Sequence, residues 1–138
     1  MRWLAVVLLA AAPKLAAAAD APPPDAVDGI VYFGSASSSL TGDAYDLLRQ
    51  VAATLRADPS LRLEVEGHSD TSASAATNVP LSQERAEVVR DFLVSLGIAP
   101  GRLAAKGHGA WRPVNDNSTL ELRAWNRRVL FRRLERAP

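Results

Sequence analysis

The sequence predicts a two-layer α/β (α+β) sandwich in which a mixed four-stranded sheet is covered by helices. Apolar residues alternate in some segments and recur at three- and four-residue steps in others, and the two patterns follow each other in the order β-α-β-α-β-(α)-β. The 138 residues suit one domain, and a hydrophobic fraction of 48% is ordinary for a single core. Early parallel crossovers and an antiparallel last strand are expected.

The first strand is predicted at residues 30–33, where the run Ile-Val-Tyr-Phe stops at Gly34 and a serine cluster. A helix should follow, with its N-cap at Thr41 and its end before Asp58-Pro59. Its apolar face consists of Tyr45, Leu48, Val51, Ala52 and Leu55.

The second strand is predicted from the alternation of Leu61, Leu63 and Val65 with charged residues. This period of two places one face on the core and the other, with Glu66, near water. The segment Gly67-His68-Ser69-Asp70 then lies at the C-terminal end of the strand.

The small and polar residues 71–77 predict a surface loop, and Ser82 predicts the N-cap of a second helix that Gly97 ends in a left-handed conformation. Arg85 lies inside the apolar sector of this helix. With Ser82 as N-cap, Arg85 would be in the first turn, where the helix dipole disfavours a cation by roughly 0.3–1 kcal/mol. Two interpretations remain open: its methylene stem covers the core edge, or its guanidinium is held for an anion.

The C-terminal part predicts two further strands with a short helix between them. Residues 103–106 form the third strand, closed by Gly107-His108-Gly109. Ser118 or Thr119 is expected to cap a helix that runs through Ala124, and residues 127–134 alternate as a last strand.

The N-terminus is typical of an export signal. A basic start is followed by the apolar run LAVVLLAAA and by alanines up to Ala19, which predicts a signal peptide at 1–19. An uncleaved anchor and a cytosolic apolar tail are the alternatives. Residues 20–28 contain three prolines and predict a linker, which leaves 29–138 as the folded domain.

Composition excludes several classes of site. A net charge of +1 gives no general case for nucleic acid binding, although arginines crowd the C-terminal end. The absence of cysteine excludes disulfides, thiolate metal sites and a lipid-modified cysteine. We therefore expect no nucleic acid partner, no cofactor and no membrane span in the mature form.

Asp70 and Arg85 form the most specific pair of candidate residues. Asp70 ends a core strand, and the loop between the two residues is long enough to fold back over the end of the sheet. A carboxylate beside a guanidinium suits a zwitterion such as an amino-acid terminus. A plain salt bridge between loop and helix is the alternative.

The chain resembles the OmpA-like peptidoglycan-associated domain, which is also found in the lipoprotein Pal and in the flagellar stator protein MotB. The resemblance covers most of residues 31–134. It rests on Val31-Tyr32-Phe33 with Ser37 and Leu40, Val65-Glu66-Gly67-His68-Ser69-Asp70, Asn78 with Leu81-Ser82 and Arg85-Ala86, Gly97-Ile98 with Arg102-Leu103, Gly107-x-Gly109 with Pro113, and Asn117 with Arg123 and Asn126-Arg127-Arg128-Val129.

The resemblance implies non-covalent binding of peptidoglycan through the meso-diaminopimelate of the stem peptide. Asp70 would take the ammonium group of this residue, and Arg85 its carboxylate. Further contributions to the pocket are implied for Phe33, Gly34, Thr71, Asn78, Leu81, Asn126 and Arg128. The domain would lie in the periplasm, associated with the cell wall or the outer membrane, with envelope proteins as further partners.

Two departures from the family pattern bear on this function. Gly34-Ser35-Ala36 replace the usual Asp-Phe-Asp, so a carboxylate at one wall of the pocket is missing. Backbone groups are expected to line that wall, since glycine permits close approach. Trp125 replaces a polar residue and either packs on the core edge or offers a stacking surface. The alternative function is an assembly or oligomerisation module of an envelope complex with a degenerate pocket.

An enzyme is not expected. His68, Ser69 and Asp70 supply the residue types of a hydrolase triad, but successive side chains of an extended segment point to opposite faces. A metal site from His68, Asp70 and His108 lacks a supporting ligand spacing. His68 is instead expected to be an exposed residue at a strand end.

Overall fold

The computed structural model describes residues 26–111, 113–115 and 117–134. The predicted signal at 1–19 and residues 20–25 of the predicted linker lie outside this part of the chain. Within it, the elements are β1 (Ala26–Tyr32), α2 (Gly42–Ala57), β2 (Leu63–Gly67), α3 (Ala75–Ser95), the 3₁₀ turn η2 (Pro100–Arg102), β3 (Leu103–Gly107), α4 (Leu120–Ala124) and β4 (Arg128–Arg133).

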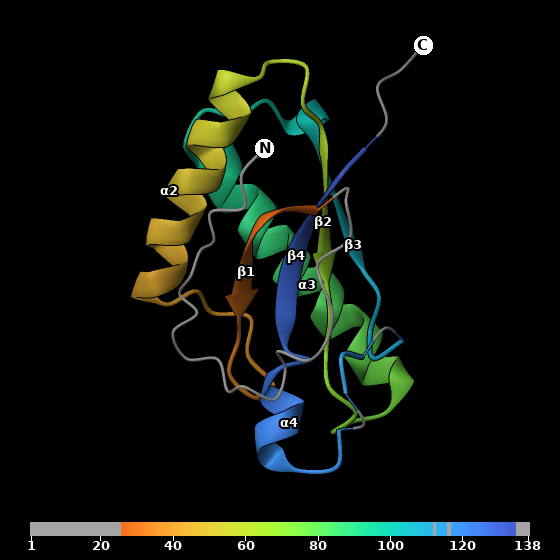
Figure 1. Ribbon diagram of the computed structural model, residues 1–138. Coiled ribbons are helices and arrows are strands. Elements are labelled where there is room, and N and C mark those ends of the chain that lie inside the picture. The colour runs from red at the N-terminus through yellow and green to blue at the C-terminus, as the bar shows by residue number, and fades with distance from the viewer. Residues whose placement is uncertain (1–25, 112, 116, 135–138) are drawn as a thin grey trace.

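The strands form a mixed sheet in the order β1-β4-β2-β3. β4 lies between β1 and β2 and runs antiparallel to both, while β2 and β3 are parallel. Figure 1 shows α2 and α3 packed along the sheet, with the short α4 at its lower end. The predicted fold class and the antiparallel pairing of the last strand are therefore confirmed.

The core lies between the sheet and the helices α2 and α3. Alternate residues of each strand point into it, because successive side chains of a strand face opposite sides. The buried apolar residues include Val31, Leu48, Val51, Leu55, Leu63, Val65, Val89, Leu93, Val129 and Phe131, each at most 2% exposed.

Several predicted boundaries agree with the structure, and others move. Thr41 is the N-cap of α2, and Thr119 rather than Ser118 caps α4, since its side chain accepts a hydrogen bond from the Leu122 amide. Gly97 follows α3 with φ of 98°, as predicted. β1 starts at Ala26, within the predicted linker and ahead of the predicted strand, and its pairing with β4 shifts register around Gly29, whose φ is 126°.

The predicted start of α3 is wrong. The helix begins at Ala75 after the N-cap Ser74, so residues 75–77 are helical and Pro80 lies inside the helix. Arg85 is therefore about three turns beyond the helix start, and the predicted conflict with the helix dipole does not arise. Ser82 has a different role: its Oγ accepts the Gly109 amide at 2.7 Å and donates to the Val79 carbonyl.

Two glycines allow α3 to lie directly on the ends of β2 and β3. A Cβ at Gly67 would lie 1.9 Å from the Ser82 carbonyl oxygen, and one at Gly107 would lie 2.3 Å from the Gln83 amide nitrogen. Gln83 also bonds this edge, accepting the Gly107 amide at 2.7 Å. The glycines before both histidines thus permit the close approach that brings Arg85 to the end of the sheet.

The outer face of the sheet is less exposed than predicted. Glu66 and His68 are each 1% exposed, so the predictions that Glu66 lies near water and that His68 is exposed are wrong. Arg128, at 5% exposed, is also buried on this face. The insertion of β4 beside β2 explains the burial of Glu66, because it places Arg132 within 2.6 Å of its carboxylate. A buried carboxylate is tolerated when it is paired in this way.

Candidate functional site

Arg85 is a fully buried side chain bound by backbone carbonyls. Its Nε donates to the Ser37 carbonyl at 2.7 Å, Nη1 to His68 at 3.0 Å and Nη2 to Gly34 at 3.0 Å. The guanidinium carbon also lies 5.3 Å from the centre of the Phe33 ring. Arg85 therefore ties the loop between β1 and α2 to the end of β2.

Burial of the guanidinium disfavours the charged form of Arg85. Burial, and next the nearby positive charge of Arg127, lower the pKa of Arg85 to about 10, and the charge of Asp70 acts in the opposite direction. At neutral pH the guanidinium remains charged. Neither interpretation made from the sequence describes this state fully, because the guanidinium does not reach water from the core edge and its present partners are carbonyls.

Asp70 is paired with Arg127 rather than with Arg85. Its Oδ2 lies 3.1 Å from Arg127 Nη1, and its Oδ1 accepts the Ser72 amide at 2.9 Å. Burial acts to raise the pKa of Asp70, but the hydrogen bonds from Ser72 and the contact with Arg127 outweigh it and hold the pKa below its ordinary value. The expected salt bridge between loop and helix is thus a bridge between the loop and the start of β4.

Asp70, Arg85 and Arg127 form one charge cluster at the end of the sheet. Arg127 Nε donates to the Phe33 carbonyl at 2.9 Å, while Arg85 binds the next carbonyl, that of Gly34. Two consecutive carbonyls after β1 thus hold both guanidinium groups. The structure brings Asp70, Arg85, Phe33 and Gly34 together, as predicted for one site, but between the described residues it gives no direct Asp70–Arg85 contact.

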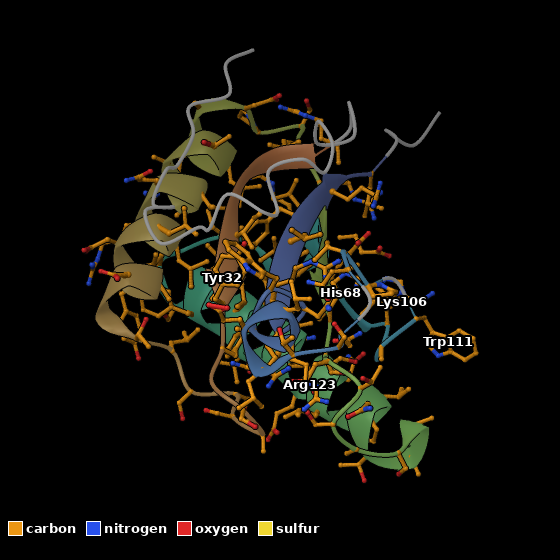
Figure 2. All side chains as sticks on the ribbon, turned by 60° about the horizontal axis from the view of Figure 1, so that its bottom comes forward. Tyr32, His68, Lys106, Trp111 and Arg123 are labelled. Atoms are coloured by element: carbon orange, nitrogen blue, oxygen red, sulfur yellow. The ribbon has the colours of Figure 1, made fainter. Side chains whose placement is uncertain are left out.

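Thr71, which directly follows Asp70 in the chain, and Asn78 line an open hollow of about 480 Å³. The Asn78 side chain donates to the Ala73 carbonyl at 2.7 Å and fixes the loop before α3. Leu81 is half-buried one turn further along α3. Figure 2 shows Trp111 projecting outward from the loop after β3. The lining residues are Thr71, Ala73, Ala75, Asn78, Val79, Ala110, Trp111 and Pro113.

Asn126 and Arg128 have other contacts. Asn126 is fully buried, accepts the Val114 amide at 2.7 Å and donates to Asn115 and Asn117, so it organises the loop before α4. Arg128 donates to Asn126 and lies on the outer face of the sheet. These hydrogen bonds connect Asn126 and Arg128 to the segment around α4 rather than to Asp70 or Arg85.

Arg127 is the cluster residue that the sequence interpretation missed. A signal existed in Asn126-Arg127-Arg128, because alternation at the start of a strand sends the two arginines to opposite faces. Only Arg127 then faces the end where Asp70 lies.

The two departures from the family pattern have structural outcomes. At the first departure, the Gly34 carbonyl accepts a hydrogen bond from Arg85 Nη2 at 3.0 Å. Close approach does not require glycine there, because an added Cβ would meet only Ser37 Cβ, at 3.8 Å. Trp125 is half-buried and packs edge-on against Tyr32, an exposed residue of β1, with ring centres 5.5 Å apart, so its contact lies outside the core.

The sequence of this domain matches a known protein family. The model of the OmpA family matches residues 32–127. The chain belongs to the OmpA family. This OmpA-family domain is 41% identical over 101 residues to peptidoglycan-binding protein ArfA of Mycobacterium tuberculosis, covering 73% of this chain and 31% of ArfA. It is 42% identical over 100 residues to outer membrane porin F of Pseudomonas aeruginosa, covering 72% of this chain and 29% of the porin.

Solved structures support the same family. The peptidoglycan-associated lipoprotein of Burkholderia pseudomallei matches with a TM-score of 0.74 and 30% identity over 76% of this chain and 89% of that chain. The C-terminal domain of Helicobacter pylori MotB matches with a TM-score of 0.72 at 23% identity, covering 79% of this chain and 86% of that chain, and shows the shared fold.

Only part of each curated relative corresponds to this domain. The OmpA-family domain spans about a third of the length of the curated relatives named above. These relatives and the matching structure are named for peptidoglycan binding, for a porin and for a lipoprotein, and none of these names states a reaction. None of the helices described within residues 26–134 has the length and apolar character needed to cross a membrane.

Proposed function

We propose that this OmpA-family domain binds peptidoglycan non-covalently through the free end of meso-diaminopimelate in the stem peptide. It would tether an envelope component to the cell wall from the periplasmic side. The observation that carries the proposal is the charge cluster, in which a carboxylate and two guanidinium groups are fixed at one end of the sheet. The names of a 41% identical relative and of the 30% identical structure support peptidoglycan as the ligand.

Asp70 is the proposed acceptor of the ligand ammonium group. Its carboxylate has about four acceptor positions, and the Ser72 amide, the Ser72 hydroxyl and Arg127 use three of them. Its lowered pKa keeps it ionised at neutral pH. An ammonium group can therefore add to Asp70 without the loss of the existing contacts.

Arg85 is the proposed partner of the ligand carboxylate. Three of the five N–H groups of a guanidinium are used by the carbonyls of Ser37, His68 and Gly34, which leaves two. Because the side chain is fully buried, a carboxylate reaches these groups only if the flanking loops open. Residues 34–36 and 71–77 are exposed loop or helix-start positions that can make this movement.

The remaining candidate residues have supporting parts in this proposal. Thr71 and Asn78 line the open hollow and would contact the stem peptide outside the charged end, and Leu81 would contribute from the next turn of α3. Phe33 and Gly34 supply the carbonyls that hold the two arginines. Asn126 and Arg128 would act by fixing the neighbouring loop.

A sacculus pull-down with a charge-neutral variant tests the function. Insoluble diaminopimelate-containing sacculi should retain the wild type and lose Asp70→Asn, which can still accept the Ser72 amide. Asp91→Asn removes a carboxylate from an exposed position on α3 and should be retained like the wild type. Arg85→Ala is a poorer probe, since it also removes three internal hydrogen bonds.

The same experiment separates wall binding from the structural alternative. If the wild type remains in the supernatant together with both variants, the domain is not a wall-binding module. The replacement of the usual acidic residues by Gly34-Ser35-Ala36 would then mark a degenerate pocket in an assembly module.

A further inference from the structure

A second polar cluster lies on the sheet face opposite α2 and α3. Glu64 and Glu66 project from β2 on the side away from the core, and His108 follows β3 on the same side. One ligand atom from each of the three side chains lies within 4.8 Å of the other two. The cluster is independent of Asp70 and Arg85, so it is not part of the proposed wall-binding site.

The distances place one imidazole and two carboxylates around a common point. His108 Nε2 lies 3.7 Å from Glu64 Oε1, and Arg132 Nε lies 2.6 Å from Glu66 Oε2. The other oxygen of Glu66, Oε1, lies 3.5 Å from His68 Nε2. In a tetrahedral zinc site with bonds of about 2.0–2.1 Å, ligand atoms lie roughly 3.4 Å apart, so small side-chain rotations suffice.

His68 supplies a second observation at the same place. It is 1% exposed, and neither of its ring nitrogens has an aligned hydrogen-bond partner within the described part of the chain. Its ring stacks on His108 with centres 5.2 Å apart and planes at 19°. A buried imidazole without aligned partners is costly. Its Nε2 is directed at the cluster, 3.5 Å from Glu66 Oε1.

The side chains around the cluster carry charges of both signs. Glu64 and Glu66 are carboxylates on one strand, and Arg132 already pairs with Glu66 at 2.6 Å. The positive charges that face the cluster are Lys106, Arg128 and Arg132, and they will oppose tight binding.

We propose that Glu64, Glu66 and His108 form a binding site for a divalent transition metal, with Zn²⁺ as the best match. One imidazole and two carboxylates are a three-residue zinc ligand set that leaves the fourth position to water. The imidazole ligand disfavours Mg²⁺ and Ca²⁺, which prefer oxygen. His68 acts as a positioning residue beside Glu66 and His108. Glu64 and His108, at 21% and 11% side-chain exposure, provide the entry path.

This site differs from the metal site rejected on sequence grounds. That alternative combined His68, Asp70 and His108, whereas the structure pairs Asp70 with Arg127 and places Glu64 and Glu66 beside His108. The sequence spacing of these residues did not predict the site, because Glu64 and Glu66 lie on β2 whereas His108 follows the parallel strand β3.

Calorimetric titration with zinc chloride tests the proposal. The protein must carry no histidine tag, because the chain itself has only two histidines. The wild type should bind one Zn²⁺, and Glu64→Gln and His108→Gln should each lose at least about tenfold in affinity. Glu84→Gln, which removes an exposed carboxylate of α3, should bind as the wild type does. Calcium and magnesium chloride should give no binding heat.

A measurement on the unmodified protein guards against misfolded variants. In a nitrogen-15 spectrum, zinc should shift the His108 ring resonances, and it should raise the melting temperature of the wild type. Zinc binding with equal affinity in the wild type, Glu64→Gln and His108→Gln would overturn the proposal. So would the absence of both the binding heat and the His108 shift under excess zinc.

Discussion

Replacing Arg85 by alanine should destabilise the fold strongly, because Arg85 is a structural residue as well as a candidate ligand-binding residue. Three hydrogen bonds from a charged donor contribute about 1.5–3 kcal/mol each, or roughly 4.5–9 kcal/mol together. The lowered pKa of about 10, against 12.5, indicates that burying the charge costs at most roughly 3 kcal/mol. Subtracting this cost from the contribution of the three bonds predicts a loss of roughly 1.5–6 kcal/mol for Arg85→Ala.

Urea unfolding followed by circular dichroism measures this loss. Arg90→Ala is the matched control, since Arg90 lies on the same helix and pairs only with the exposed Asp91. Its loss should be about 1 kcal/mol or less. If Arg85→Ala loses less than about 1 kcal/mol, the three carbonyls do not depend on the guanidinium and the reasoning is refuted.

Three further predictions concern the end of the sheet. Gly67→Ala should lose about 2–3 kcal/mol in urea unfolding, because its Cβ would overlap the Ser82 carbonyl of α3; a neutral effect would contradict the close packing. Asp70→Asn should lower the free energy of unfolding at neutral pH. This difference from the wild type should disappear as pH falls below 3.8, because the folded protein holds the pKa of Asp70 below that value. A difference that persists in acid unfolding curves would be evidence against the Arg127 and Ser72 contacts. The free energy of unfolding of Gly34→Asp should lie within about 0.5 kcal/mol of the wild-type value, because the new Cβ meets only Ser37 Cβ, at 3.8 Å. The variant should also be retained more strongly on sacculi. Weaker retention would show that this wall does not contact the ligand.

The fold was largely predictable because local patterns and tertiary packing agree. The alternation from Leu63 to Val65 and the helical period from Tyr45 to Leu55 each mark a face that packs on one core. Turn and cap residues such as Gly97 and Thr119 act through local geometry, so their neighbours in sequence are sufficient to predict them.

The start of α3 was not predictable from the same rules. Residues 71–77 have the composition of a loop, and Pro80 and Ser82 suggest a later start. The helix nevertheless begins at Ala75, where Ser74 accepts the amides of Thr77 and Asn78 through its carbonyl. The helix packs on Gly67 and Gly107 at Ser82 and Gln83, about two turns beyond its start, and such long-range contacts are not visible in a local window.

The candidate site was predictable in its residue types but not in its pairings. Sequence placed Asp70 and Arg85 at one end of the sheet, yet Asp70 pairs with Arg127 because β4 enters the middle of the sheet. The same insertion brings Arg132 to Glu66 and buries a face that alternation alone predicts to be solvated. Strand order was therefore the missing information in both cases.

Titration with two soluble muropeptides tests the central proposal most directly. One carries meso-diaminopimelate, and the other carries lysine, which has the side-chain ammonium but lacks the adjoining carboxylate. The account predicts that the diaminopimelate form shifts the amide resonances of Ser72 and the Arg85 side-chain signals, and that it binds at least about tenfold more tightly, because the lysine form cannot use a charge-assisted bond worth about 1.5–3 kcal/mol. Equal affinity for both muropeptides, or shifts confined to residues outside the charge cluster, would contradict recognition by Asp70 and Arg85.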